Sequence, residues 1–255
     1  MKATDRRNKI KELLDIHGSV EVANLSQLLD VSMETIRRDL DIICEQYDVK
    51  KIHGGAIKNS SHSTDYFFTK RINKNLEEKR AIAKKAASFI EDGDVIGLDT
   101  GTTILQLVDF IYDKNISIVT CSLPVISALS KFDISNLKCK VIFLGGEFNT
   151  NSLSVFGELT IDMLSNLNIS KLFISPDGFD ENTGFSYHNL REGMLTKEFI
   201  KQSDKSFMLI DSEKLTEKAF YNIGKADMVN SIITTVNCSN DFKDKNPNCH
   251  WIIAE

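Results

Sequence analysis

Two groups of residues in this sequence have the types and spacing that binding chemistry requires. The first is the adjacent pair Arg37 and Arg38 within "VSMETIRRDL", residues 31–40. Guanidinium groups grip phosphates and can donate paired hydrogen bonds to guanine O6 and N7. The second is "DTGTT", residues 99–103, in which a carboxylate, a glycine and two hydroxyls follow an apolar run. Backbone amides beside a glycine, together with threonine hydroxyls, can hold an anion such as a phosphoryl group.

The residues around the arginine pair predict a helix that presents both guanidinium groups to solvent. Ile36, Leu40 and Ile43 recur at helical spacing and define one apolar face. On the same helical wheel Arg38 lies nearly opposite that face, and Arg37 lies on its flank. Neither arginine is therefore needed for a core that this helix could build.

The elements on either side of this helix indicate DNA binding rather than ordinary surface pairing. In the alternative interpretation, the two arginines only pair with Glu34 and Asp41 one helical turn away. However, a short helix predicted over residues 23–29 and a tight turn precede them, and "VKKIHGGAIK" at 49–58 predicts a basic two-stranded wing. The order helix, turn, helix and wing predicts a winged helix-turn-helix domain over residues 1–58.

Charge and composition constrain the class of protein. The 255 residues carry a formal net charge of −5, but residues 1–58 contain ten basic and ten acidic side chains, so the acidic excess lies in the remainder. DNA binding must therefore depend on where the basic residues lie. No apolar run approaches the roughly 20 residues that span a bilayer, so we expect a cytoplasmic protein with no membrane partner. Five scattered cysteines without a Cys-x-x-Cys motif favour neither disulfides nor zinc, and we expect no metal and no cofactor.

The remainder of the chain has the pattern of a parallel α/β domain, predicted over residues 76–255 after a linker at 59–75 and beginning with a helix at 76–91. Short, fully apolar runs alternate with helical stretches, which indicates a mainly parallel sheet covered on both faces. Ligands of such sheets bind where the strands end. The predicted strands are 95–99, 117–120, 140–146, 171–175, 206–211, 231–235 and "HWII" at 250–253.

Polar or glycine residues follow five of these strands: "DTGTT", "TCS", "GG", "SPDGFDE" and "DSEK" in chain order. Because the carboxyl ends of parallel strands share one edge, the five loops together predict a pocket for a polyol phosphate. Taken alone, each loop could equally be a plain turn or helix cap. The expected effector-binding residues are Asp99, Gly101, Thr102, Thr103, Thr120, Ser122, Gly145, Gly146, Asp177, Asp180 and Lys214.

Both halves of the chain resemble the DeoR-type bacterial transcription regulators. The resemblance is carried by "RR-x-x-I-x-x-LL", "VS-x-x-TIRRDL" and "HGGA", and then by Lys79, "D-x-GTT", Thr120, Ser122, Gly145-Gly146, Gly157, Glu192 and "D-S-x-K" at 211–214. It implies a sensor domain similar to ribose-5-phosphate isomerase and CoA-transferase folds, in which a phosphorylated sugar binds over "DTGTT" and Lys214 counters its charge. Tyr47 replaces a usual helix-closing glycine, and a left-handed tyrosine there would be strained. With the basic wing, the residues expected at DNA are Ser32, Thr35, Arg37, Arg38, Lys50, Lys51 and His53.

The sequence therefore predicts a regulator and not an enzyme: a repressor of a carbohydrate-utilisation operon, modulated by a phosphorylated sugar. It would bind double-stranded operator DNA as a homo-oligomer, a dimer or tetramer. The alternative is a sugar-phosphate isomerase or acyl-transfer enzyme with an accessory DNA-binding domain. In that case the carboxylates of "DGFDE" and Glu192 would transfer protons. That chemistry leaves the leading 58 residues without a purpose, which favours the regulator.

Overall fold

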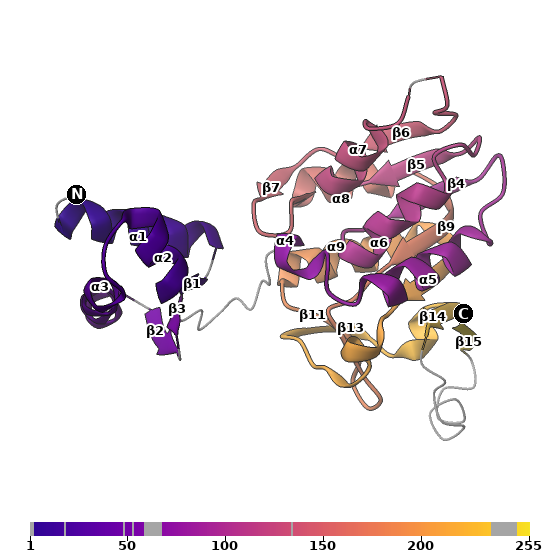
Figure 1. The fold of residues 1–255 in the computed structure, drawn as a ribbon. Helices are drawn as coiled ribbons and strands as arrows, with labels where there is room; N and C mark the ends of the chain where they lie inside the picture. The colour runs from indigo at the N-terminus through magenta and orange to yellow at the C-terminus, as the bar shows by residue number, and fades with distance from the viewer. Residues whose placement is uncertain are drawn as a thin grey trace. The chain divides into compact units, whose positions relative to one another are not determined.

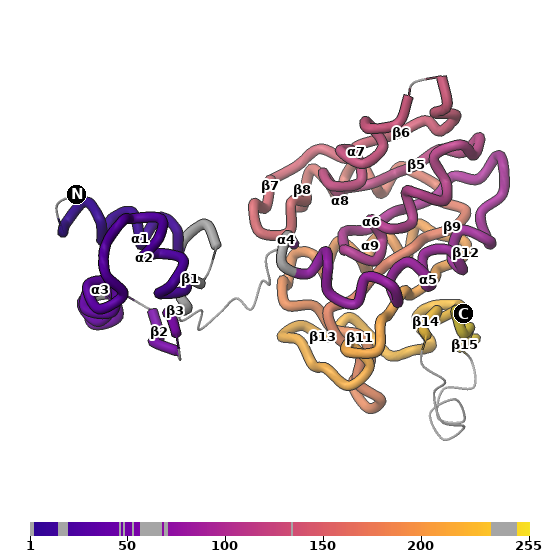
Figure 2. The backbone as a smooth tube through the Cα atoms, viewed as in Figure 1, coloured from indigo at the N-terminus to yellow at the C-terminus, as the bar shows by residue number. Residues whose placement is uncertain are grey.

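The computed structural model describes residues 3–17, 19–47, 49–52, 54–58, 68–133, 135–235 and 249–255, in two compact units that divide between residues 67 and 68. The ribbon and the tube of Figures 1 and 2 follow the chain through each unit. His53 and residues 59–67 of the predicted linker lie outside the described ranges. Within those ranges, no helix combines the length and the apolar character needed to cross a bilayer.

The smaller unit is the predicted winged helix-turn-helix. Its elements are α1 (Ala3–His17), β1 (Ser19–Glu21), α2 (Val22–Leu29), α3 (Met33–Gln46), β2 (Val49–Ile52) and β3 (Gly55–Lys58). The strands form an antiparallel sheet in the order β1-β3-β2, and the β2–β3 hairpin is the wing. Asp30, with φ +50°, makes the turn between α2 and α3. The apolar face predicted on α3 (Ile36, Leu40 and Ile43) lies in the core of this unit.

Helix α3 begins as the sequence predicts and ends differently. The Ser32 hydroxyl accepts the Thr35 backbone N–H at 3.2 Å, which is an ordinary N-cap. At the other end Tyr47 is extended, with φ −132°, so it avoids the strain that a left-handed tyrosine would have. The reason is that the chain continues almost directly into β2 at Val49 and needs no reversal of direction. The Tyr47 hydroxyl accepts a hydrogen bond from Lys11 Nζ at 3.0 Å.

A buried ion pair fastens α3 to α1. Arg6 Nε donates to Asp39 Oδ2 at 2.6 Å, and Arg7 Nε lies 3.8 Å from Asp39 Oδ1. The side chains of Arg6 and Asp39 are only 10% and 6% exposed. Each of these buried charges is stabilised by the other, because an unpaired ion in an apolar interior costs several kcal/mol of folding free energy, of order 3–5 kcal/mol. The contact therefore sets how α3 is oriented on the rest of the unit.

The larger unit is built on a seven-stranded sheet in which every neighbouring pair is parallel, as predicted. The strand order is β15-β14-β12-β9-β4-β5-β6. The strands are β4 (Val95–Leu98), β5 (Ser117–Thr120), β6 (Lys140–Phe143), β9 (Ile169–Ile174), β12 (Ser203–Leu209), β14 (Ser231–Thr234) and β15 (His250–Ile253).

Helices cover both faces of this sheet, which explains why its strands read as continuous apolar runs. On β9, Phe173 packs with Ile82 of α5, whereas its neighbour Leu172 packs in a second cluster with Phe199 of α9. Helices α5, α6 and α7 share the first cluster, and α8 and α9 share the second. The helices are α4 (Phe68–Arg71), α5 (Leu76–Ala87), α6 (Thr102–Leu107), α7 (Leu123–Leu129), α8 (Glu158–Ser165) and α9 (Leu190–Lys201), with short 3₁₀ turns η1 (Val108–Phe110), η2 (Ser212–Thr216) and η3 (Ala226–Met228).

Two small antiparallel sheets, which the sequence did not predict, follow the carboxyl ends of β6 and β9. One pairs β7 (Glu147–Asn149) with β8 (Ser154–Phe156), and the other orders β10 (Gly178–Asp180), β11 (Gly184–Tyr187) and β13 (Tyr221–Gly224). Strands of three or four residues are too short to show an alternating pattern. The β10–β11 hairpin turns at Gly184, whose φ of +81° favours glycine.

The predicted linker extends too far. Its last eight residues, 68–75, belong to the larger unit and begin with α4. Phe68 is buried there, and its backbone N–H donates to the Asn151 carbonyl at 3.1 Å. The polar composition of this stretch predicts a linker, because its contacts are with residues far away in the sequence.

Candidate functional site

The arginine pair lies exposed on α3. The side chains of Arg37 and Arg38 are 54% and 78% exposed, and their guanidinium nitrogens approach Glu34 only at 3.7 and 3.5 Å. Exposed ion pairs at such distances contribute little to stability. DNA phosphates can therefore replace Glu34 as the partner of each arginine. Asp41 pairs with Lys51 of the wing and with neither arginine. The alternative interpretation thus holds only for Glu34.

The other residues expected at DNA occupy the start of α3 and the wing. The hydroxyls of Ser32 and Thr35 lie 2.9 Å apart at the N-terminus of α3, and both lysines of β2, Lys50 and Lys51, are exposed. His53 lies outside the described residues. The described residues that are expected at DNA therefore lie on α3 with its N-cap and on β2, which contacts α3.

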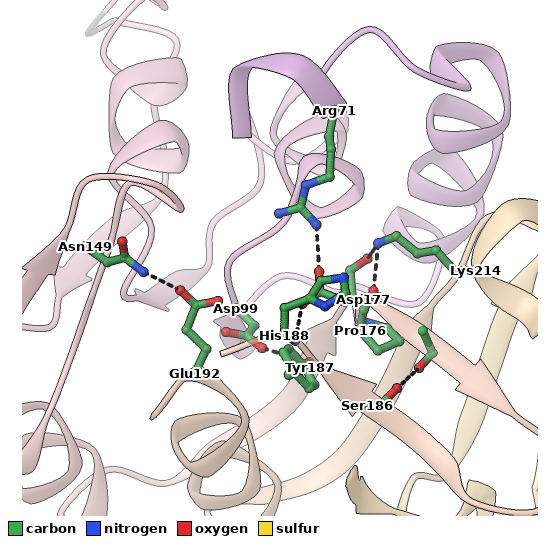
Figure 3. Close-up of polar contacts among 12 residues, drawn as sticks. Arg71, Asp99, Asn149, Pro176, Asp177, Ser186, Tyr187, His188, Glu192 and Lys214 are labelled. Atoms are coloured by element: carbon green, nitrogen blue, oxygen red, sulfur yellow. Dashed lines mark hydrogen bonds and ion pairs between the residues drawn. The ribbon is translucent and has the colours of Figure 1, made fainter. Parts of the chain in front are cut away.

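In the larger unit, three cations from three elements converge at the carboxyl ends of β9 and β12. Arg71 of α4 donates from Nη1 to Asp177 Oδ1 at 2.6 Å, and Lys214 Nζ donates to the Pro176 carbonyl at 2.7 Å (Figure 3). Lys79 of α5 donates from Nζ to the Arg71 carbonyl at 2.7 Å. The three positive groups therefore share one small region of the sheet edge.

The electrostatics of this cluster favour an anion. Burial, together with the positive charges of Lys214 and Arg71, lowers the pKa of Lys79 to about 8 against the opposing effects of Asp211 and Glu213. Burial likewise lowers the pKa of Lys214. Burial would raise the pKa of Asp177, but Arg71 and Lys214 hold it below its usual value. Three cations thus face two buried carboxylates, and one oxygen of Asp211 is buried without a hydrogen-bond partner.

The loop "DTGTT" lies beside this cluster, with Asp99 turned inward beneath it. Asp99 is 2% exposed; its Oδ2 accepts from the hydroxyls of Thr196 at 2.7 Å and Tyr187 at 3.4 Å, and its Oδ1 accepts the Thr100 N–H at 2.7 Å. Burial raises the pKa of this carboxyl to about 6. The structure therefore gives Asp99 the geometry of an anchor for the loop.

Gly101 brings the loop close to the residues that Lys214 contacts. Its φ is +146°, and a Cβ on it would lie 3.2 Å from Ser175 Cβ. Lys214 Nζ in turn lies 3.3 Å from the Ser175 hydroxyl. Both the positive φ and the close approach to Ser175 favour glycine at residue 101.

Four predicted hydroxyl residues lie buried where the strands β4 and β5 end. Thr120 Oγ1 donates to the Leu98 carbonyl at 2.7 Å and accepts the Ser122 N–H at 3.1 Å. Thr102 is buried beside Thr103 at the start of α6. The hydroxyl oxygens of Thr103 and Ser122 are buried with no hydrogen-bond partner in the described structure. Buried hydroxyls of this kind are sites where a bound polyol can complete the hydrogen bonding.

The structure does not bring Gly145, Gly146 or Asp180 to this region. The Gly145 carbonyl accepts from Thr160 of α8 at 2.7 Å, and Gly146 packs against the same helix because β6 is the edge strand of the sheet. Asp180 caps the β10–β11 hairpin, where Oδ1 accepts the Thr183 N–H at 2.9 Å. These contacts give the three residues roles in local folding.

Comparison with known proteins identifies both units. The DeoR-like helix-turn-helix domain matches residues 6–62, and the DeoR C terminal sensor domain matches residues 74–235. The chain belongs to the DeoR family. It is 33% identical to the HTH-type transcriptional regulator YulB of Bacillus subtilis over 92% of this chain and 89% of that protein. It is also 33% identical to a lactose phosphotransferase system repressor of Staphylococcus epidermidis, over 96% of each.

Among solved structures, this DeoR-family chain matches ribose 5-phosphate isomerase A from Methanocaldococcus jannaschii with a TM-score of 0.41 and 17% identity, over 56% of this chain and 55% of that one. The full-length relatives quoted above are named as regulators of transcription and not as enzymes.

Two cations of the DeoR sensor unit were absent from the predicted site. In the sequence Lys79 stands out only through the family resemblance, although it lies three residues before Ile82 and seven before Ala86, on the buried face of α5. That spacing was the signal for its burial. Arg71 carried no signal, because it stands in a polar stretch predicted as linker. Across the site from these cations, Asn149 Nδ2 donates to Glu192 Oε1 at 3.0 Å (Figure 3).

Proposed function

We propose that this DeoR-family protein is a repressor of a carbohydrate-utilisation operon, and that a phosphorylated sugar bound to the sensor unit modulates its binding to operator DNA. The observation that carries the proposal is the convergence of Arg71, Lys79 and Lys214 at the carboxyl edge of the sheet, where the buried hydroxyls of Thr103 and Ser122 follow the strands β4 and β5. The name of the lactose phosphotransferase system repressor supports a sugar operon as the target.

The cationic side chains suit the phosphoryl group of a sugar phosphate, and the buried hydroxyls suit its sugar hydroxyl groups. Lysine and arginine donate charge-assisted hydrogen bonds, which are the strong ones, to phosphoryl oxygens. The hydroxyls of Thr103 and Ser122 can exchange hydrogen bonds with the hydroxyl groups of a polyol. An unphosphorylated sugar would leave the excess positive charge uncompensated, so the phosphoryl group should dominate affinity.

The regulator would act as a homo-oligomer. A single small unit with no net positive charge in residues 1–58 makes few phosphate contacts. Two linked units bind two half-sites with a high effective concentration, which raises affinity without new contacts. An effector then changes operator affinity if it prefers one arrangement of the units over another.

A thermal-shift screen against phosphorylated pentoses and hexoses tests the sensor site. A ligand at 100 times its Kd stabilises the protein by about 2.7 kcal/mol, or roughly 5–10 °C for a unit of this size. We expect at least one such shift, and we expect Lys214→Ala to weaken that ligand at least tenfold because the cation is lost. Lys205→Ala, at an exposed position on β12, is the matched control and should bind normally. A screen without any shift contradicts the proposal.

The affinity for the phosphorylated ligand should depend on pH through Lys79. Its pKa of about 8 in the free protein rises when a phosphoryl group binds, so full affinity is present below pH 8 and is lost as pH rises above it. Isothermal titration should show about a tenfold loss per pH unit between 8.5 and 9.5. Lys79→Met should bind weakly and lose most of this dependence on pH. Equal affinity for the wild-type protein at pH 7.5 and 9.5 would exclude this role for Lys79.

A further inference from the structure

Strand β6 stands at the edge of the large sheet but has the composition of an interior strand. It ends the sheet at the border opposite β15 (Figure 1), and three of its four residues are apolar. Val141, Ile142 and Phe143 are each 40% exposed, whereas Ile252 on the other edge strand is buried. Continuous apolar runs are typical of strands covered on both faces, and proteins protect a free edge with charges, prolines or bulges. The residues of β6 therefore indicate that another strand covers this border.

The exposed apolar surface of β6 continues onto a neighbouring helix. Ile142 aligns with Val119 of β5, which packs in the cluster that α8 shares, so Ile142 points to the α8 face of the sheet. Met163 of α8 is 41% exposed, and its Sδ accepts the Gly145 N–H at 3.3 Å just after β6. The other two apolar side chains of β6 point to the opposite face, because side chains alternate along a strand. Apolar surface is therefore exposed on both faces of this border.

The border also presents backbone groups in the arrangement that a further strand binds. The N–H groups of Lys140 and Leu144 donate to carbonyls at the two ends of β5, at 2.8 and 2.9 Å. Every second residue of a parallel strand directs its N–H and C=O toward the neighbour, so Val141 and Phe143 direct theirs away from β5. Within the described part of the chain, no strand pairs with that side of β6. The two residues thus offer two donors and two acceptors at the free edge.

We propose that β6 pairs antiparallel with β6 of a second copy of this chain, across a two-fold axis at Ile142. In this register Val141 of each copy exchanges two hydrogen bonds with Phe143 of the other, and the two Ile142 side chains face each other as a non-hydrogen-bonded pair. The sheet then runs without interruption from one copy into the next. This inference rests on the proposed function, to which it adds the interface of the homo-oligomer.

The charges around β6 favour a second copy as the occupant. Exposed Lys138 and Lys140 lie at the start of the strand, and exposed Glu147 and Glu158 follow its end, in β7 and at the start of α8. Glu147 also accepts from Arg191 at 2.6 Å, which leaves Glu158 as the stronger attraction. Antiparallel pairing places the basic end of each copy beside the acidic end of the other. The edge is therefore complementary to itself, and a contact of this kind closes after two copies.

Ile142→Cys in the full-length protein tests the register. The Cβ atoms of a directly opposed antiparallel pair lie about 4.5–5.5 Å apart, close to the separation in a disulfide. Mild oxidation should therefore convert most of this variant into a cross-linked dimer on a non-reducing gel. Val141→Cys is the matched control because its residue is equally exposed but lies opposite Phe143, which separates the two copies of residue 141 by more than the roughly 7 Å that a disulfide spans. We expect no cross-link in this control or in the wild-type protein, and equal cross-linking of the two variants would exclude the register.

Ile142→Lys tests whether the same edge holds the oligomer together. Two like charges facing each other on the axis should weaken dimerisation at least tenfold in analytical ultracentrifugation. Affinity for a selected operator with two half-sites should fall at least tenfold, while binding to a duplex with one half-site stays unchanged. Phe220→Lys adds the same charge at an apolar residue that is 75% exposed next to β13, and it should assemble and bind like the wild-type protein.

The outcomes separate the interface from the proposed function. If the wild-type protein is a dimer or larger, but Ile142→Cys does not cross-link and Ile142→Lys assembles normally, pairing through β6 is excluded while the proposed function stands. If the wild-type protein is a monomer at the concentrations that bind operator DNA, a second copy is excluded as the occupant of the edge. That result would also overturn the homo-oligomer of the proposed function.

Discussion

Replacing both exposed arginines of α3, Arg37→Ala with Arg38→Ala, is expected to weaken selective operator binding about a hundredfold. A good bidentate base contact is worth about 1–3 kcal/mol, and losing two phosphate contacts would lower the salt slope by about two. The fold should survive, because each guanidinium makes only a loose, exposed pair with Glu34. Fluorescence anisotropy on a duplex selected by the wild-type protein from a random library, at several salt concentrations, measures both quantities.

The matched control removes the same charge from another helix of the same unit. Lys9 pairs with Glu12 on α1, and Lys11 contacts the Tyr47 hydroxyl at the end of α3, so Lys9→Ala with Lys11→Ala lowers the net charge and leaves both arginines of α3 in place. We expect this control to weaken binding to all sequences by less than about tenfold and to keep the preference for the selected duplex. If the two double variants lose selectivity equally, α3 is not the recognition helix.

The second large effect concerns stability, and its target is Asp39. Asp39→Ala leaves Arg6 buried without its 2.6 Å partner, and breaking a buried pair in this way costs about 3–5 kcal/mol. A unit of about 60 residues has little more stability than that to lose. Hydrogen exchange of the full-length protein should show the amides of α1 and α3 exchanging at least a hundred times faster, while those of the central strands β4 and β9 are unchanged.

Asp41→Ala, two residues further along the same helix, is the matched control. Asp41 pairs with Lys51 at the surface, where both side chains are about half exposed. Exposed pairs contribute about 0–1 kcal/mol, so exchange in α1 and α3 should accelerate less than about fivefold. If Asp39→Ala and Asp41→Ala accelerated hydrogen exchange equally, the buried ion pair would contribute no more to stability than the exposed one.

The elements that position the DNA-binding residues could be predicted because local rules determine them. The 3.6-residue period of Ile36, Leu40 and Ile43 and the cap at Ser32 define α3. The strands of the large sheet were equally evident, since burial on both faces produces uninterrupted apolar runs. Both signals depend on neighbours in the sequence, which a single chain reveals.

The composition of the candidate effector site depends on strand order, which the sequence does not reveal. Parallel strands share an edge, but β6 lies at the border of the sheet while β9 is inserted beside β4, so Gly145 and Ser175 have different surroundings. Arg71 shows a second limit: its position follows from a 2.6 Å contact with Asp177, a partner 106 residues away. Pairings at such separation leave no periodic pattern.

The pairing of β4 with β9 also affects the order in which the two units can fold during synthesis. Ile96 aligns with Lys171, so the middle of the sheet cannot close until the ribosome has released residues some 75 positions further on. The winged unit is complete by Lys58 and contains mostly local contacts, and domains made first generally fold first. A nascent chain therefore completes its DNA-binding unit well before the sheet of the larger unit can close. A message truncated between these points would encode the winged unit without the larger unit.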